Sequence, residues 1–216
     1  MKKVFNIILF ACMSSLVFSI GDPYTEAMKE GMTMLEKAQN SDDFLAAANQ
    51  FERISNVAAD NWHPAYYTAY ARAIAASMVN ESTRKEELLD QAEVALKKAS
   101  GVDHDKSEVG TLQGFIHMLR IAVDPNVRGQ QYSMMSSASL QKALAINPDN
   151  PRAMYMQAQL SFGTAQFFGS DTSDACAAVD RAISLFEKSE MEPSADPFAP
   201  NWGKLFALSF QKQCTD

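Results

Sequence analysis

The chain has 216 residues and carries 26 acidic against 19 basic side chains, a formal net charge of −7 at pH 7. Nucleic-acid binding relies on clustered Lys and Arg that neutralise phosphates, so this balance argues against nucleic acid as the main partner. At the start of the chain, Lys2 and Lys3 precede an apolar run that is too short to cross a bilayer, and small residues stand before Asp22. This order is typical of a secretory signal peptide, and we expect residues 1–21 to be removed on export.

Two alternatives to cleavage at that point remain open. Cys12 follows residues 9–11 as in a loose lipoprotein cleavage box, although the apolar run continues past it to Ile20. The other alternative is a retained membrane anchor. No later segment is apolar and long enough to span a membrane, so we expect residues 22–216 to form one exported domain, periplasmic or secreted. The Lys-Lys style of the signal indicates a bacterial envelope.

Helical periodicity and turn signals divide this domain into helices, and no strand-like alternation of any length appears. The predicted helices form pairs: 24–39 with 42–58, 64–79 with 83–100, 107–122 with 130–146, and 151–166 with 172–188. A last helix, 202–213, follows a link rich in helix breakers. We expect this helix to cap the fourth pair, because a stack of helical pairs leaves its final apolar face uncovered.

The clearest signal lies between the third and fourth pairs, where residues 142–153 read KALAINPDNPRA. Pro148 must end the first helix, and Pro151 fits the first turn of the next, so the two helices fold back as a tight hairpin. The string resembles the junction between two tetratricopeptide repeats (TPRs). The resemblance implies an all-α fold, a TPR-like α-solenoid of about four helical pairs plus a C-terminal capping helix. An irregular helical bundle is the alternative.

A repeated spacing in the second helix of each pair supports the solenoid. A small residue is followed four positions on by a large apolar one, and usually three further on by another small one, which keeps all three on one face. The members are Ala47, Phe51 and Ile54; Ala92, Leu96 and Ala99; Ser136, Leu140 and Ala143; and Ala175, Val179 and Ala182. In the first helix of the third pair, Gly110 and Gly114 fit a close-packing position.

No catalytic constellation or metal-binding motif emerges. The three histidines, His63, His104 and His117, belong to no HExxH, Cys/His cluster or nucleophile elbow. We therefore expect a non-enzymatic protein without a cofactor or a metal. Two function classes remain: a scaffold that binds a peptide or protein in the concave face of the solenoid, and a small-molecule-binding or transport-accessory protein that uses the same concavity as a pocket. We favour the scaffold.

Candidate partner-binding residues fall into two groups. Tyr66, Tyr67, Tyr70 and Tyr155 could line the concave face. Residues 123–129 and 163–170 are predicted to be inserted loops on one edge of the stack, where repeat proteins often bind partners. Arg128 offers a bidentate donor for a carboxylate, and Phe167 and Phe168 offer apolar area, as at binding hot spots. The alternative is that Arg128 pairs with an acid of this chain and both phenylalanines pack on their own helices.

The two cysteines of the exported domain, Cys176 and Cys214, are predicted to form a disulfide. Export would place them in an oxidising compartment. Cys176 lies about twelve residues before the end of its predicted helix, and Cys214 lies about twelve residues after the start of the last helix. Antiparallel packing of these two helices would therefore bring both cysteines to the same level, roughly 18 Å from the turn. Two buried free thiols are the alternative.

Overall fold

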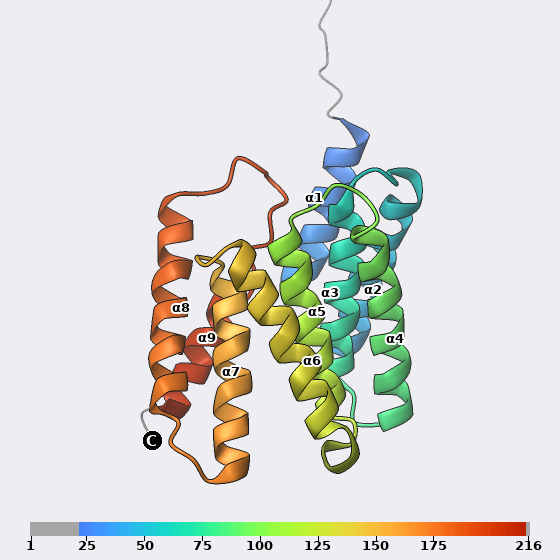
Figure 1. Ribbon diagram of the computed structural model, residues 1–216. Coiled ribbons are helices and arrows are strands. Elements are labelled where there is room, and N and C mark those ends of the chain that lie inside the picture. The colour runs from blue at the N-terminus through green and yellow to red at the C-terminus, as the bar shows by residue number, and fades with distance from the viewer. Residues whose placement is uncertain (1–21, 215–216) are drawn as a thin grey trace, which may run out of the picture.

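The computed structural model describes residues 22–214, which form helices and no β-strand (Figure 1). The helices are α1 (Pro23–Lys37), α2 (Ser41–Val57), α3 (Trp62–Met78), α4 (Ser82–Ala99), α5 (Lys106–Ile121), α6 (Pro125–Ile146), α7 (Pro151–Phe168), α8 (Ser173–Met191) and α9 (Lys204–Gln211), followed by a 3-10 turn at Lys212–Cys214. The predicted signal peptide lies outside the described residues. None of the described helices combines the length and hydropathy that a bilayer-spanning segment needs.

Polar side chains fix where most of the helices begin. Asp22, Asn40, Glu81, Asp105, Asp124 and Asn150 each accept a hydrogen bond from a backbone N–H in the first turn of the helix that follows. These caps also correct the prediction of inserted loops. Asp124 caps α6 and Pro125 occupies its first turn, so α6 begins at Pro125 and not at residue 130. Residues 163–168 likewise extend α7, which ends at the left-handed Gly169.

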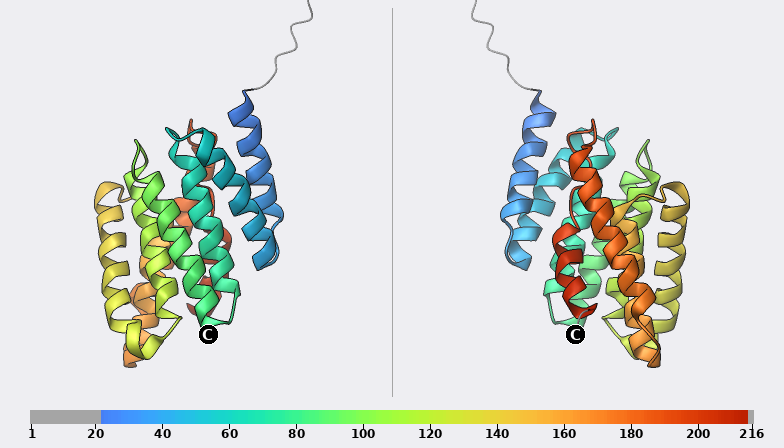
Figure 2. Two further views of the ribbon diagram at one scale, coloured as in Figure 1. Left: turned by 90° about the vertical axis from the view of Figure 1, so that its right-hand side faces the viewer. Right: turned by 90° about the vertical axis from the view of Figure 1, so that its left-hand side faces the viewer.

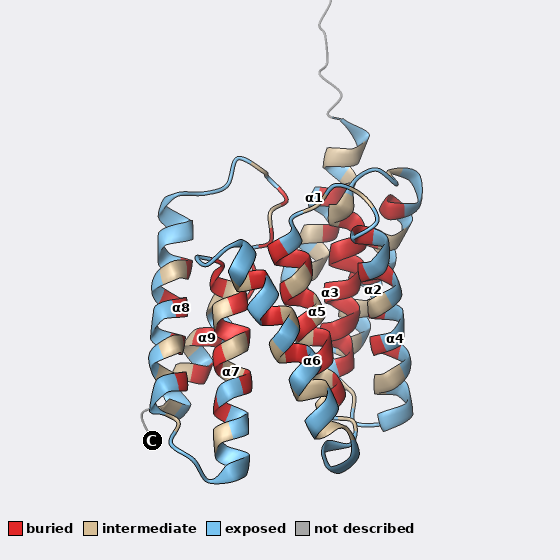
Figure 3. Cartoon of the chain, viewed as in Figure 1, coloured by how far each residue is buried: buried red, intermediate tan, exposed pale blue. Residues whose placement is uncertain are grey.

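The paired helices stack side by side into a curved layer, as the two end views show (Figure 2). The all-α repeat arrangement predicted from the sequence is therefore confirmed. Every member of the small–large–small pattern in α2, α4, α6 and α8 is buried. α3 is buried almost all round, with an unbroken run of buried residues from Pro64 to Ala76, whereas α6 and α8 expose much of their surface (Figure 3). A helix that is apolar on all sides belongs in the core.

Gly114 shows why the third pair needs a glycine. A Cβ atom built on Gly114 would lie 2.6 Å from Cγ of Leu140, which is fully buried in α6. The Ser136 hydroxyl donates to the Gly114 carbonyl over 2.8 Å, which fixes the crossing of the two helices at the same place. The close-packing role predicted for Gly114 is therefore confirmed.

The C-terminal segment, residues 192–214, does more than cap the fourth pair. It contacts α1, α3, α5 and α7, the first helix of every pair, through the aromatic residues Phe198, Trp202 and Phe210. α9 packs against α7 and α8, and Cys214 lies beside Cys176 of α8 with an S–S distance of 2.02 Å, the predicted pairing. Leu205 and Phe206 of α9 stay exposed, so only part of its apolar surface is covered.

Candidate functional site

The concave face of the solenoid is occupied by the chain itself. Tyr66 and Tyr67 are fully buried, and Tyr70 and Tyr155 nearly so. Trp202 Nε1 donates to the hydroxyl of Tyr66 over 2.9 Å and its ring stacks on Tyr70 at 4.9 Å between centroids. The prediction that these tyrosines meet a partner is therefore wrong for this conformation, because the C-terminal segment covers them.

Hydrogen bonds and burial hold these tyrosines as neutral core groups. The Tyr67 hydroxyl donates to the carbonyl of Phe198 over 3.1 Å. Burial raises the pKa of Tyr66, Tyr67 and Tyr70, and it raises the pKa of Tyr155 to about 12. A peptide could reach this face only if residues 192–214 moved away.

Arg128 belongs to an ion-pair cluster that ties three helices together. Its guanidinium pairs with Glu86 of α4, as does that of the buried Arg120 of α5. Arg120 also pairs with Asp90 at 2.7 Å and Glu93 at 3.1 Å. The structure thus supports the alternative interpretation, in which Arg128 pairs with an acid of its own chain and is not a free donor for a partner's carboxylate.

The two phenylalanines at the end of α7 do not fold back over their helix. Phe167 is 80% exposed and Phe168 is 72% exposed, and their rings meet edge to face with centroids 5.1 Å apart. Gly169, with a φ of +64°, ends α7 directly after them. This part of the prediction places apolar area at the surface, as expected. The residues around the two rings show that one of these phenylalanines borders a groove.

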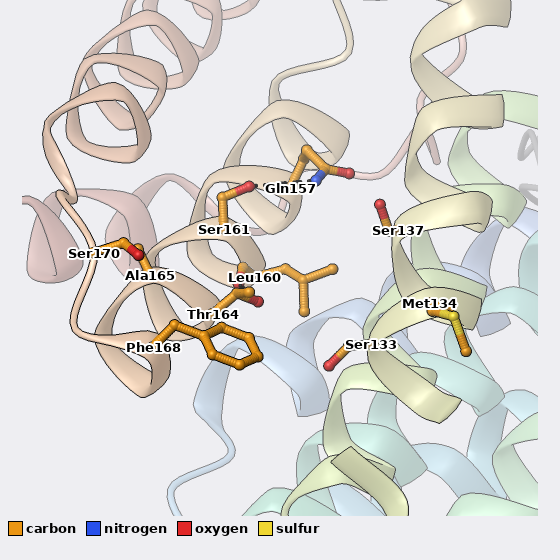
Figure 4. A pocket seen from close by; sticks show the side chains of 10 residues that line it. All are labelled: Ser133, Met134, Ser137, Gln157, Leu160, Ser161, Thr164, Ala165, Phe168 and Ser170. Atoms are coloured by element: carbon orange, nitrogen blue, oxygen red, sulfur yellow. Dashed lines mark hydrogen bonds between the residues drawn. The ribbon is translucent and has the colours of Figure 1, made fainter. Parts of the chain in front are cut away.

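A groove lies between α6 and α7, which diverge from their short connection (Figures 1 and 4). Its volume is about 480 Å³, within the range of small-molecule sites. The lining residues are Ser133, Met134 and Ser137 of α6, Gln157, Leu160, Ser161, Thr164, Ala165 and Phe168 of α7, and Ser170. Phe168 therefore contributes to the groove, and Phe167 does not.

The groove was missed from the sequence, although the sequence carries a signal for it. Residues 129–141 of α6 and 153–170, which include most of α7, contain no Asp, Glu, Lys or Arg, in a chain of which 21% is charged. Solvent-exposed helix faces normally carry charges. Two neighbouring helices that expose surface without charge therefore indicate a binding site for an uncharged or apolar surface.

One polar atom in the groove lacks a partner. Gln157 places Nε2 3.4 Å from the hydroxyl oxygen of Ser161, while its Oε1 is buried and makes no hydrogen bond within residues 22–214. Gln157 and Ser161 also line a second hollow of about 130 Å³ between α7 and α8. A buried amide oxygen without a partner is costly.

The described residues include no cluster of three or more His, Cys, Asp and Glu side chains that could hold a metal ion. His63 pairs with Asp196 of the C-terminal segment at 2.7 Å, and His117 contacts the amide of Gln113, four residues earlier on α5, at 2.9 Å. Burial lowers the pKa of His117, which favours the neutral imidazole. Both histidines therefore serve packing. Neither lines the α6–α7 groove.

Comparisons with solved structures show a relationship to a known protein. No protein-family model matches the chain, TPR models included, and no curated protein matches it. Among solved structures, the chain is similar to the HusA haemophore from Porphyromonas gingivalis, with 31% sequence identity and a TM-score of 0.79. The alignment covers 90% of this chain and 94% of that one. The likeness thus extends over nearly the whole of both chains, whereas membership of the TPR family stays a prediction.

Proposed function

Because the chain belongs to the family of the HusA haemophore, we propose that it is a non-enzymatic carrier that binds haem or a related tetrapyrrole in the groove between α6 and α7. The observation that carries this proposal is the uncharged lining of an open groove in an otherwise charged surface. The haemophore likeness favours the small-molecule class over the scaffold. The chain's own C-terminal segment fills the concave face that a scaffold would use.

The lining suits a flat apolar ring system. Leu160, Met134 and Phe168 offer apolar contact from both walls, and several hydroxyl groups surround them. In proteins, haem iron is commonly held by His, Cys, Tyr or Met. Among the residues that line the groove, Met134 is of one of these types. We propose that contact with the ring face supplies most of the affinity, because apolar burial and aromatic packing need no iron ligand.

The proposed site of action is outside the cytoplasm. The predicted signal peptide would export the chain, and the Cys176–Cys214 disulfide indicates an oxidising compartment. A carrier exported in this way would meet its ligand in the envelope or beyond it.

Titration of the mature protein with iron(III) protoporphyrin, followed by visible absorbance, tests the proposal. Covering about half of the Phe168 ring, roughly 80 Å², at about 25 cal/mol per Å² contributes about 2 kcal/mol, so Phe168→Ala should weaken binding about 30-fold. Phe167→Ala is the matched control, because Phe167 is exposed next to Phe168 but does not line the groove. Met134→Leu keeps the apolar volume and should change affinity less than about threefold.

Two results would contradict the proposal. If the wild-type protein gives no saturable spectral change, the chain does not bind this ligand. If Phe167→Ala and Phe168→Ala weaken binding equally, the ligand lies outside the groove. A large loss of affinity with Met134→Leu would instead show that the sulfur holds the iron.

A protein-binding scaffold remains the second candidate, and the exposure of Phe167 favours it. An 80% exposed phenylalanine at the end of a helix is the type of residue that anchors protein interfaces. Affinity capture from envelope extract with wild-type protein and Phe167→Ala would test this candidate. A partner that both proteins retain equally would not use this edge.

A further inference from the structure

The two ends of the α6–α7 groove differ in chemistry. Near the connection between the helices, Ser137 of α6 and Gln157 of α7 stand on opposite walls (Figure 4). Towards the open end, Phe168 and Met134 supply apolar surface beside the hydroxyl groups of Ser133 and Thr164. The order follows from the antiparallel hairpin, in which residues nearest the connection on each helix lie at the same level. Hydroxyl groups therefore line both ends of the groove, whereas its side-chain amide lies at one end and its aromatic ring at the other.

The end of the groove at Gln157 and Ser137 offers hydrogen-bond donors without a positive charge. The Ser137 oxygen accepts from the Gln141 amide over 3.0 Å, which leaves the hydroxyl hydrogen for a ligand. The Ser161 hydroxyl both donates and accepts, so it pairs with either end of the Gln157 carboxamide. Half a turn of this carboxamide places its NH₂ group where the buried, unpartnered oxygen now lies, at the wall of the groove. Gln157 and Ser137 then provide two donors for one acceptor group.

Resting on the function proposed above, we infer that Gln157 and Ser137 bind a carboxylate of the ligand and so set its orientation. A tetrapyrrole of the haem type carries its two carboxylates on one edge and hydrocarbon groups on the other. The carboxylate edge lies at the Gln157 end of the groove, and the hydrocarbon edge lies on Phe168 and Met134. Gln157 is thus a specificity-determining residue that selects tetrapyrroles with a free carboxylate.

The test compares two ligands that differ only in this group. Iron(III) mesoporphyrin and its dimethyl ester are titrated, in one buffer with the same low detergent concentration, into the wild type, Gln157→Met and Ser137→Ala. Methionine keeps the length and the helix propensity of glutamine. Gln159→Met is the matched control, since Gln159 lies on the same helix and does not line the groove.

For the free dicarboxylate, Gln157→Met is expected to weaken binding about tenfold and Ser137→Ala severalfold, because each removes a hydrogen bond to a charged group. For the diester, the affinity of both variants should stay within about threefold of the wild-type affinity. Equal losses for both ligands, or no loss for either, would overturn the assignment of Gln157 while leaving the groove as the binding site. If neither ligand binds to the wild type, the proposed function itself fails. Unchanged melting midpoints confirm that the variants are folded.

Discussion

Asn150, at the junction between the third and fourth pairs, joins α7 to α5 and so fixes one wall of the groove. Its side chain is fully buried. Its Oδ1 accepts from the backbone N–H groups of Arg152 and Ala153 at 3.0 and 3.1 Å, which caps α7. Its Nδ2 donates to the hydroxyl of Ser107 and to the carboxylate of Glu108, both at 2.9 Å, on α5. Each end of one amide therefore holds a different helix.

The cost of removing this amide follows from these contacts. Asn150→Ala loses the cap, about 1 kcal/mol, and the hydrogen bond to a buried carboxylate, about 2 kcal/mol. The sum, about 3 kcal/mol, should lower the melting midpoint by about 6–12 °C in a domain of this size. Arg152 still pairs with Glu108 at 2.7 Å, so α7 keeps a second anchor on α5.

Asn150→Asp separates the contribution of the α7 cap from that of the hydrogen bond to Glu108. It has the same shape and keeps the cap acceptor, but it replaces the donor with an oxygen that faces the Glu108 carboxylate. Burial and the Glu108 carboxylate raise the pKa of the introduced carboxyl in the folded state, against the opposing effect of the two cap N–H groups and of Arg152, which already pairs with Glu108. With a raised pKa, the folded protein takes up this proton at a higher pH than the unfolded chain does. The destabilisation by Asn150→Asp is therefore largest at neutral pH and shrinks towards pH 5.

Thermal unfolding followed by circular dichroism at pH 7 and pH 5 measures both variants. Asn147→Asp is the control, because Asn147 is exposed in the same connection and its oxygen only accepts from the Asp149 N–H. The free energy of unfolding of this control should stay within about 0.5 kcal/mol of that of the wild type. If Asn150→Asp is as stable as the wild type at pH 7, the hydrogen bond that Asn150 donates to Glu108 contributes nothing to the stability of the fold.

Two further predictions concern packing and covalent structure. Gly114→Ala should lower the free energy of unfolding by about 1–3 kcal/mol, because its methyl group would meet Leu140, while Gly163→Ala, which has no atom within 4 Å of the new Cβ, should stabilise α7 by up to about 1 kcal/mol. Equal effects at both glycines in chemical denaturation would contradict the close approach. Replacing Cys176 and Cys214 together with alanine should cost about 4 kcal/mol by the loop-closure estimate for a separation of 38 residues. Two reactive thiols in the unfolded, unreduced wild type would show that no bond exists.

Local sequence patterns were enough to predict the helical pairs, the small–large–small contact faces and the tight hairpin at Pro148 and Pro151. These features depend on periodicity and backbone chemistry within a few residues, which a single sequence carries in full. The pairing of Cys176 with Cys214 was also predictable, since α8, which carries Cys176, and the C-terminal segment, which carries Cys214, are adjacent in the chain.

Which candidate residues are accessible to a ligand depends on contacts between distant parts of the chain. Tyr66 and Tyr67 became core residues because the segment around Trp202, far along the chain, lies over them. Arg128 lost its predicted role because Glu86, on a helix earlier in the chain, pairs with it. The groove arises from the angle between α6 and α7, which long-range contacts such as those of Asn150 set. Such contacts join residues whose separation in the chain leaves no local pattern, so the sequence showed the uncharged walls but not the space between them.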